Sequence, residues 1–223
     1  MNKKFIEYLV ANKVLKFGDF TLKSGRKSPY FITTGVLNGG KSSYELGLFF
    51  AKAMEKSFGS DFDTIYGPAY KGIPLAVSAA IGVYRKSKGK DCTWLFDRKE
   101  AKDHAEKSEF VGDGPRDAQK IIMIDDVFTT GGTKDGAIKK LKSVANVDIK
   151  GIVIAVDREE KGIAKNAIKE FEEATNIRVY AIEKISNIFK YLHNREIGGQ
   201  IHVNDQIMVS FKEYQKQFGA KYE

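Results

Sequence analysis

The sequence predicts an α/β fold, a parallel sheet flanked by helices, with a small N-terminal cap of a helix and short strands. Between residues 64 and 182, short apolar runs alternate with longer segments of helical periodicity. Continuous apolar or β-branched runs are typical of parallel strands buried on both faces, and their alternation with helices favours right-handed crossovers. A short helical segment and two strand-like runs around a turn precede this region, and they predict a cap (hood) in residues 1–40. The length fits one domain, residues 1–223.

Five apolar runs are the predicted strands of the sheet. They are residues 64–66, 93–96, 120–124, 150–156 and 178–182. The segments between them carry an apolar face or consist of small apolar residues, as helices packed on a sheet do. The predicted helices are residues 44–58, residues 73–84 and the segment after Thr133.

The cap begins with a helix near residues 5–10, followed by FTLKSGRKSPYFIT, which has the pattern of two strands around a Ser-Gly-Arg turn. At the other end of the chain, Asp205 is a candidate N-cap of an amphipathic helix through IMVSFKEYQKQF. Residues 98–118 are rich in Lys, Asp, Glu and Gly and have no clear period. Because loops of this length in compact domains are usually functional or disordered, we interpret the segment as a mobile active-site loop.

The composition favours an anionic small-molecule substrate. Lys and Arg outnumber Asp and Glu by 37 to 29, which gives a net charge of +8 and favours anionic partners. The basic residues are spread along the chain, without an arginine-rich arm, zinc-finger spacing or basic-aromatic RNP motif. We therefore expect a polyphosphate substrate and no nucleic acid.

Two further features concern location and redox chemistry. No stretch approaches ~18 consecutive apolar residues, and the N-terminus lacks the apolar run of a secretory signal, so we expect a cytoplasmic protein that binds no membrane. Cys92 is the single cysteine, and it can form neither an internal disulfide nor a cysteine cluster for zinc. We expect this thiol to fill space in the core.

The segment IIMIDDVFTTGGTKDG, residues 121–136, is the strongest local signal. An apolar strand ends in two acids, and a turn rich in hydroxyls and glycines then leads into a helix. Such a turn exposes backbone N–H groups at a helix start and can cradle a phosphate. Asp125 and Asp126 stand at the carboxyl end of the strand, where open α/β sheets bind ligands, and can accept hydrogen bonds from two vicinal sugar hydroxyls. Together they predict a ribose 5-phosphate site, and the absence of a GxxxxGK[ST] loop argues against a nucleoside triphosphatase.

Two other loops carry residues suited to the same ligands. Tyr70 and Lys71 lie between a predicted strand end and a helix start, where backbone N–H groups and an ammonium can bind pyrophosphate. Arg158 follows another strand end in AVDRE and could either receive a carboxylate or pair with Glu159 or Glu160. His193 and His202 fit no motif, and we expect them at the surface or an interface.

The strand, the two acids and the Thr/Gly turn resemble the hallmark of type I phosphoribosyltransferases. Three more segments resemble orotate phosphoribosyltransferases in order and spacing: FTLKSGRKSPYF at 20–31, GPAYKGIP at 67–74 and DRKEAKDHAE at 97–106. The resemblance runs from about residue 5 to the Arg195 region. It implies the type I phosphoribosyltransferase fold and transfer of the 5-phosphoribosyl group from phosphoribosyl pyrophosphate to orotate. The products would be orotidine 5′-monophosphate and pyrophosphate, in de novo pyrimidine (UMP) synthesis.

The resemblance also implies the parts that individual residues would play. Catalysis would fall to Lys102, His104, Asp125 and Asp126. Phosphoribosyl pyrophosphate would be bound by Lys23, Tyr70, Lys71, Arg98, Lys99, Lys102, His104, Asp125, Asp126, Val127, Phe128, Thr129, Thr130, Gly131, Gly132 and Thr133. Orotate would be bound by Phe31, Ile32, Thr129 and Arg158, although Ile32 departs from the paired aromatic of the family.

A Mg²⁺ cofactor is expected, held mainly by substrate and water and not by direct protein ligands. The active unit would be a homodimer in which the basic loop of one subunit, with Arg98, Lys102 and His104, reaches the site of its neighbour. Two other functions were considered. A purine phosphoribosyltransferase would share the turn but would not need Arg158 or the LKSGR hairpin. A regulator that senses phosphoribosyl pyrophosphate and binds nucleic acid would need a reading element, for which the cap is too short.

Overall fold

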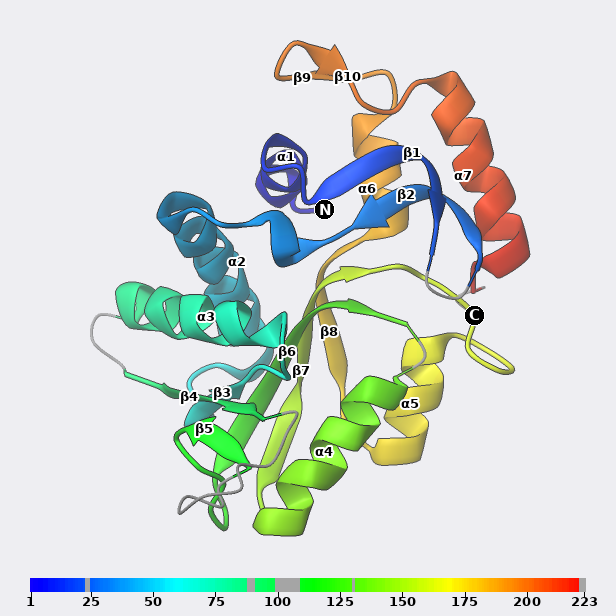
Figure 1. The fold of residues 1–223 in the computed structure, drawn as a ribbon. Helices are drawn as coiled ribbons and strands as arrows, with labels where there is room; N and C mark the ends of the chain where they lie inside the picture. Colours follow the sequence, from blue (N-terminus) through cyan, green and yellow to red (C-terminus); the bar gives the residue numbers. More distant parts are fainter. Residues whose placement is uncertain (23–24, 88–90, 99–108, 130, 221–223) are drawn as a thin grey trace.

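The computed structural model describes residues 1–22, 25–87, 91–98, 109–129 and 131–220, and its centre is a six-stranded sheet (Figure 1). The strand order is β5-β4-β3-β6-β7-β8. The strands are β3 (Thr64–Tyr66), β4 (Thr93–Asp97), β5 (Phe110–Gly112), β6 (Lys120–Phe128), β7 (Asp148–Asp157) and β8 (Val179–Lys184). Five of them are parallel, as predicted, whereas β5 is antiparallel to β4.

Helices cover both faces of the sheet, with α2 (Gly40–Phe58) and α3 (Gly72–Lys86) on one face and α4 (Gly132–Val144) and α5 (Ala167–Thr175) on the other (Figure 1). The apolar run of β6 serves both layers, because successive side chains of a strand point to opposite faces. Ile122 and Ile124 belong to the core beneath α2 and α3, and Ile121 and Met123 to the core beneath α4 and α5. This explains why β6 is apolar without alternation.

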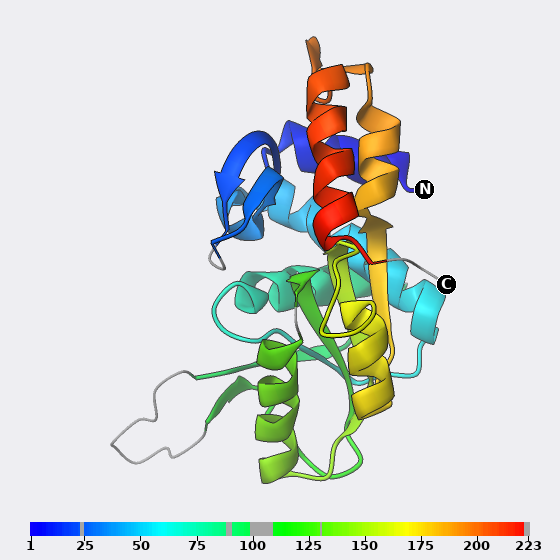
Figure 2. The ribbon, with the colours of Figure 1, turned by 90° about the vertical axis from the view of Figure 1, so that its right-hand side faces the viewer.

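The cap contains the predicted N-terminal elements and also the C-terminal part of the chain, as Figure 2 shows. Its elements are α1 (Lys3–Ala11), β1 (Leu15–Thr21), β2 (Lys27–Ile32), the 3-10 turn Thr34–Val36, α6 (Ile185–Leu192), β9 (Glu196–Ile197), β10 (Gln200–Ile201) and α7 (Asp205–Phe218). The region of residues 1–40 that was expected to form the cap thus lies beside C-terminal elements that the prediction did not include. One helix and a hairpin bury too little apolar surface, and α6 and α7 supply the rest: Phe189 and Phe211 stack at 3.7 Å between ring centroids, and both pack on Tyr30.

The start of α7 also differs from the prediction. Asn204, and not Asp205, is the N-cap, since its side-chain oxygen accepts a hydrogen bond from the Ile207 N–H at 2.9 Å. Asp205 instead accepts hydrogen bonds from His193 and Asn194, which tie the helix to the end of α6. Both residue types are good N-caps, so their adjacency left the choice to the surrounding contacts.

Residues 98–118, predicted as one loop, contain β5 and a polar anchor. Asp113 directly follows β5 and accepts hydrogen bonds from Thr93 (2.6 Å), Thr64 (3.2 Å) and Gln119 (3.0 Å). These partners hold the segment against the amino ends of β3 and β4. The segment after β5 is therefore ordered structure, while residues 99–108 lie outside the described part of the chain.

The strand order changes direction between β3 and β6. From β3 the chain builds outward through β4 to β5, and from β6 it builds the opposite way through β7 to β8. The loops that follow β3 and β6 therefore diverge to opposite sides of the sheet and leave a crevice at its carboxyl edge, where open α/β sheets bind ligands. Among the described residues, no helix is long and apolar enough to cross a membrane.

Candidate active site

A cavity of about 600 Å³ lies between the cap hairpin and the loops that follow β3, β6 and β7. This cavity lies where the loops that follow β3 and β6 diverge. Ten of the residues predicted for the site line it: Phe31, Ile32, Tyr70, Lys71, Asp125, Asp126, Val127, Thr129, Thr133 and Arg158. Three of the four sequence segments that predicted ligand contacts contribute residues to this one cavity. The fourth segment, residues 97–106, lies largely outside the described residues.

The two acids lie within β6, which extends four residues beyond its predicted end, and each is paired with a lysine. Lys71 donates a hydrogen bond to Oδ2 of Asp126 at 2.9 Å. Lys134, in the first turn of α4, donates to Oδ2 of Asp125 and, at 2.9 Å, to the carbonyl oxygen of Val127. The other oxygen of each acid accepts from the next backbone N–H of the strand, which fixes both carboxylates.

Burial and charge act against each other at Asp125. Its burial raises the pKa of the carboxyl group, the neighbouring Asp126 raises it further, and the Lys134 ammonium opposes both. The net direction is a raised pKa. The ionised form of Asp125 therefore depends on its lysine partner.

The turn after β6 is built to leave backbone N–H groups exposed at the start of α4. Gly131 occupies the N-cap position at φ +79°, and within the described part of the chain no side chain caps the helix. A Cβ at Gly131 would lie 3.0 Å from the rings of Phe128 and Phe171, so both the conformation and the space require glycine. Thr129 and Thr133 add hydroxyl groups on the cavity side, and the uncapped helix start favours an anion.

The loop after β3 closes tightly on itself. A Cβ at Gly67 would lie 2.0 Å from the carbonyl oxygen of Gly72, so the loop between them can only close with glycine at its ends. Asp97, at the end of β4, accepts hydrogen bonds from the Ala69 N–H (2.9 Å) and the Tyr66 hydroxyl (3.0 Å). These contacts position Lys71 beside the acids and leave Tyr70 66% exposed.

Arg158 lies at the end of the cavity that adjoins the cap, and it is 5% exposed. Its guanidinium donates to Glu160 at 2.8 Å and to the Tyr214 hydroxyl at 3.2 Å, and it lies 4.6 Å from the ring centroid of Tyr30. The sequence left two roles open for Arg158, and the structure shows the ion pair with Glu160. Burial lowers the pKa of the guanidinium, but Tyr30 and Glu160 outweigh it and raise the pKa, so Arg158 stays charged.

Glu160 is shared between two arginines, because Arg26 of the cap hairpin lies 3.5 Å from its second oxygen. Arg26, Arg158 and Glu160 all line the cavity, and their formal charges leave one net positive charge at this end. A ligand with a single carboxylate would neutralise this net positive charge.

Some predicted residues are not brought to the cavity wall. The side chain of Phe128 is buried in the core beneath α4 and α5, so only its backbone could serve a ligand. Arg98 closes the base of the loop through its N–H to the Glu109 carbonyl oxygen at 2.8 Å. Gly131 and Gly132 belong to the turn but not to the lining. Lys23, Lys99, Lys102, His104 and Thr130 lie outside the described residues.

Four residues of this region were missed by the sequence reasoning: Arg26, Lys134, Glu160 and Tyr214. Lys134 could have been found, since a lysine at the third helix position after two acids is within reach of the strand end that precedes the turn. Glu160 was considered only as a partner of Arg158. Tyr214 lies 54 residues from Glu160 in α7, and its hydroxyl donates to that carboxylate at 2.6 Å. No local pattern joins two such positions.

The fold and this cavity define the chain as a phosphoribosyltransferase, and comparison with known proteins gives the same class: the family described as phosphoribosyl transferase domain matches residues 38–186. An orotate phosphoribosyltransferase of Agathobacter rectalis is 42% identical over 221 residues, covering 98% of this chain and 97% of its own. One of Bifidobacterium adolescentis is 40% identical over 228 residues, covering 99% and 98%.

A crystal structure of the Francisella tularensis orotate phosphoribosyltransferase superposes with a TM-score of 0.80 at 36% identity, covering 98% of this chain and 97% of that one. The chain therefore belongs to the orotate phosphoribosyltransferase family, enzymes of pyrimidine biosynthesis. The resemblance found in its motifs and the predicted fold class are both confirmed.

Proposed function

We propose that the cavity at the carboxyl edge of β3 and β6 binds phosphoribosyl pyrophosphate and orotate and joins them into orotidine 5′-monophosphate. The observation that carries this proposal is the set of three complementary groups in one cavity. An uncapped helix start serves the 5′-phosphate, a carboxylate pair serves the ribose, and an arginine cluster with one net positive charge serves the base. Orotate carries a carboxylate that such an arginine cluster matches, whereas a purine base carries none.

The donor would lie along the turn from β6 to α4. Its 5′-phosphate would accept hydrogen bonds from the backbone of residues 129–133 and from the hydroxyls of Thr129, Thr130 and Thr133. Asp125 and Asp126 would accept hydrogen bonds from the ribose 2′- and 3′-hydroxyls. The pyrophosphate would extend toward Tyr70 and Lys71, whose ammonium is half exposed and can leave Asp126 for a phosphate oxygen.

Orotate would occupy the end of the cavity beneath the cap. Phe31 and Ile32 of β2 would supply backbone hydrogen bonds and an apolar surface for the flat ring. Lys23, which the family resemblance assigns to phosphoribosyl pyrophosphate, lies outside the described residues. The carboxylate of orotate would be received by Arg158, with Arg26 completing the positive charge at this end. Glu160 keeps both arginines oriented toward the cavity.

The donor set fits a Mg²⁺ ion that enters with the substrate. The nearest carboxylates, Asp125 and Asp126, are each occupied by a lysine, so the ion would be held by pyrophosphate and ribose oxygens and by water. When bound, it would neutralise charge that develops on the leaving pyrophosphate.

The reaction breaks the bond from C1 to pyrophosphate while a ring nitrogen of orotate adds from the opposite face. Positive charge develops on the ribose and negative charge on the leaving group, so the site acts mainly by placing opposite charges. Among the described residues, Lys71 would stabilise the negative charge on the leaving pyrophosphate. Arg98, Lys99, Lys102 and His104 would contribute from the basic loop, with His104 as a proton donor to the departing oxygen.

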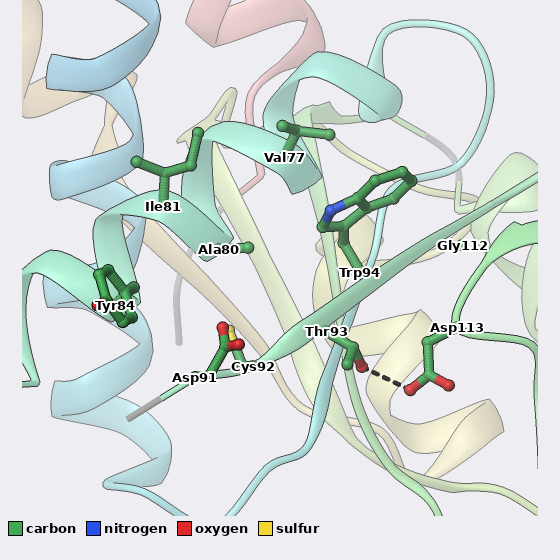
Figure 3. A pocket seen from close by; sticks show the side chains of 10 residues that line it. All are labelled: Val77, Ala80, Ile81, Tyr84, Asp91, Cys92, Thr93, Trp94, Gly112 and Asp113. Atoms are coloured by element: carbon green, nitrogen blue, oxygen red, sulfur yellow. Dashed lines mark hydrogen bonds between the residues drawn. The ribbon is translucent and has the colours of Figure 1, made fainter. Parts of the chain in front are cut away.

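The proposed assembly is a homodimer in which that loop serves the neighbouring site. An apolar face supports it: Ile81 and Tyr84 of α3 are 50% and 57% exposed. With Val77 and with Trp94 of β4 they border a hollow of about 430 Å³ (Figure 3). Large apolar side chains that gather on one exposed face are typical of an interface, and this face adjoins the base of the loop at β4 and β5. A biosynthetic enzyme of this kind is proposed to act in the cytoplasm.

A direct assay tests the activity. The purified protein, given phosphoribosyl pyrophosphate, Mg²⁺ and an equimolar mixture of orotate and adenine, should consume orotate and release pyrophosphate in equal amounts. Consumption of the purine instead would establish the purine enzyme, and binding of DNA or RNA without turnover would establish the regulator. Nucleic-acid affinity should be checked at two salt concentrations, since nonspecific binding falls steeply with salt.

A further inference from the structure

Lys134 is a charged residue that the protein buries in the wall of the proposed site. It is 5% exposed, and its ammonium lies 5.3 Å from the ring centroid of Phe128. Two acceptors hold it, the Asp125 carboxylate and the Val127 carbonyl oxygen. Because lysine is rarely buried without a partner and its desolvation is costly, these contacts call for an explanation beyond packing.

The two lysines of the acid pair differ in exposure. The side chain of Lys71 is 51% exposed, whereas that of Lys134 is 6% exposed. Lys71 can therefore turn from Asp126 to a ligand at little cost. Lys134 cannot do so, because its ammonium is enclosed by Asp125, Val127 and the ring of Phe128.

The charges that face Asp125 explain why a fixed counter-ion matters. Asp126 of β6 repels it, and Lys134 of α4 attracts it. Lys71, Arg158 and Glu160 line the same cavity from the loops after β3 and β7, but Lys71 is bonded to Asp126 and Arg158 to Glu160. Only Lys134, among the described residues, makes an ion pair with Asp125.

We infer that Lys134 is a positioning residue for the ribose: it keeps Asp125 ionised and oriented so that the carboxylate can accept a hydroxyl hydrogen bond. The inference rests on the proposed ribose contact of Asp125. It assigns no contact between Lys134 and the substrate. Its effect passes entirely through Asp125.

The test measures the binding of orotidine 5′-monophosphate by calorimetry, without Mg²⁺, at several pH values. Lys134→Met should weaken binding roughly 10- to 100-fold at neutral pH, the range for one hydrogen bond to a charged group. The ratio of variant to wild-type dissociation constants should fall as pH rises, because Asp125 ionises again in alkali. Lys134→Arg, which keeps the positive charge, should bind the nucleotide almost as tightly as the wild type does. Lys139→Met, on the exposed side of the same helix, is the matched control and should bind as the wild type does.

A double variant separates positioning from stability. Asp125→Asn should weaken binding by a ratio that does not change with pH in this range, and Asp125→Asn with Lys134→Met should be no weaker than Asp125→Asn alone. If Lys134→Met does not fold, Lys134→Gln, which keeps a donor for Val127, takes its place with the same expectation. Unchanged affinity in a variant that only melts earlier would overturn the inference, as would additive losses. Failure of the wild type to bind the nucleotide would instead overturn the proposed function.

Discussion

The ammonium of Lys71 lies 2.9 Å from Oδ2 of Asp126, although 55 residues separate them in the chain. The pair bridges the loop after β3 and the end of β6, the two strands between which the sheet changes direction. The sequence motifs proposed to bind pyrophosphate and ribose therefore meet because of strand order. The same bond orients Asp126 when no ligand competes for the lysine.

The acid pair should matter for binding more than for folding. Asp125→Asn and Asp126→Asn should each raise the Michaelis constant for phosphoribosyl pyrophosphate roughly 10-fold or more, since a neutral amide is a weaker acceptor for a ribose hydroxyl. Initial rates at varied donor concentration give this value. Circular dichroism should show an intact fold, and near-normal kinetics in both variants would remove the acids from the site.

Base selection should depend on the arginine cluster. Arg158→Ala should raise the Michaelis constant for orotate far more than that for phosphoribosyl pyrophosphate, because only orotate brings a carboxylate to this end of the cavity. The substitution also removes one of the two arginines that pair with the buried Glu160, while Arg26 and the Tyr214 hydroxyl remain. The loss of stability should therefore stay below the about 3–5 kcal/mol of a buried pair that is fully broken.

A second substitution separates these effects. Arg158→Ala combined with Glu160→Gln should recover much of the thermal stability lost by Arg158→Ala, yet the weak orotate binding should persist. Equal changes in the two Michaelis constants would show that Arg158 supports the fold and does not select the base.

The basic loop should act across a dimer. Lys102→Ala should lower turnover by roughly 10²-fold, in the range for removal of one donor to a developing charge. Co-expression of Lys102→Ala with Asp125→Asn gives about half heterodimers, in which one site carries both defects and the other none. Such samples should recover up to roughly a quarter of wild-type activity.

Mass measurement of the co-expressed sample identifies the heterodimer. If it is present and activity does not exceed that of the single variants, the loop serves its own subunit. A chain that stays monomeric at assay concentration and is fully active would reject the shared site altogether.

Acid should weaken the anchor after β5. Although burial acts to raise the pKa of Asp113, hydrogen bonds from Thr93 and Arg116 outweigh it and lower the pKa. A carboxyl group with a lowered folded-state pKa stabilises the protein above its unfolded pKa, near 4, and loses this contribution as pH falls through the folded value. Asp113→Asn should lower the free energy of unfolding by about 1 kcal/mol at neutral pH, a modest value because the side chain is partly exposed. Urea titrations should show this difference shrink as the pH falls below about 4, and a constant difference would contradict the assignment.

Much of the fold could be predicted because its signals are local. The apolar runs at β3, β6 and β7 are largely buried and those at β4 and β8 partly buried, and α2, α3 and α4 carry apolar faces, so local patterns alone located these elements. β5 was missed because it is three residues long and lies in a polar segment, where only its pairing with β4 makes it a strand. The C-terminal share of the cap was missed because it depends on contacts of Tyr30 with Phe189 and Phe211, far along the chain.

The residues of the candidate site could also be predicted only where they are neighbours in the sequence. Asp125, Asp126 and the turn to α4 are contiguous, and their chemistry could be predicted from residue type and order. The network of Arg158, Glu160, Tyr214 and Arg26 joins a strand end, a helix and a hairpin, and the burial of Lys134 depends on the ring of Phe128 and the close approach of α4 to β6. Burial and pairing of this kind are properties of the folded chain.

We propose that one cavity holds the phosphate, the ribose and the base in that order. A crystal structure of the protein with orotidine 5′-monophosphate would show this arrangement at once. We expect the phosphate at the turn of residues 129–133, the ribose hydroxyls on Asp125 and Asp126, and the carboxylate of the base at Arg158. A nucleotide bound with its carboxylate away from Arg158, or its ribose away from both acids, would show that the proposed arrangement is wrong.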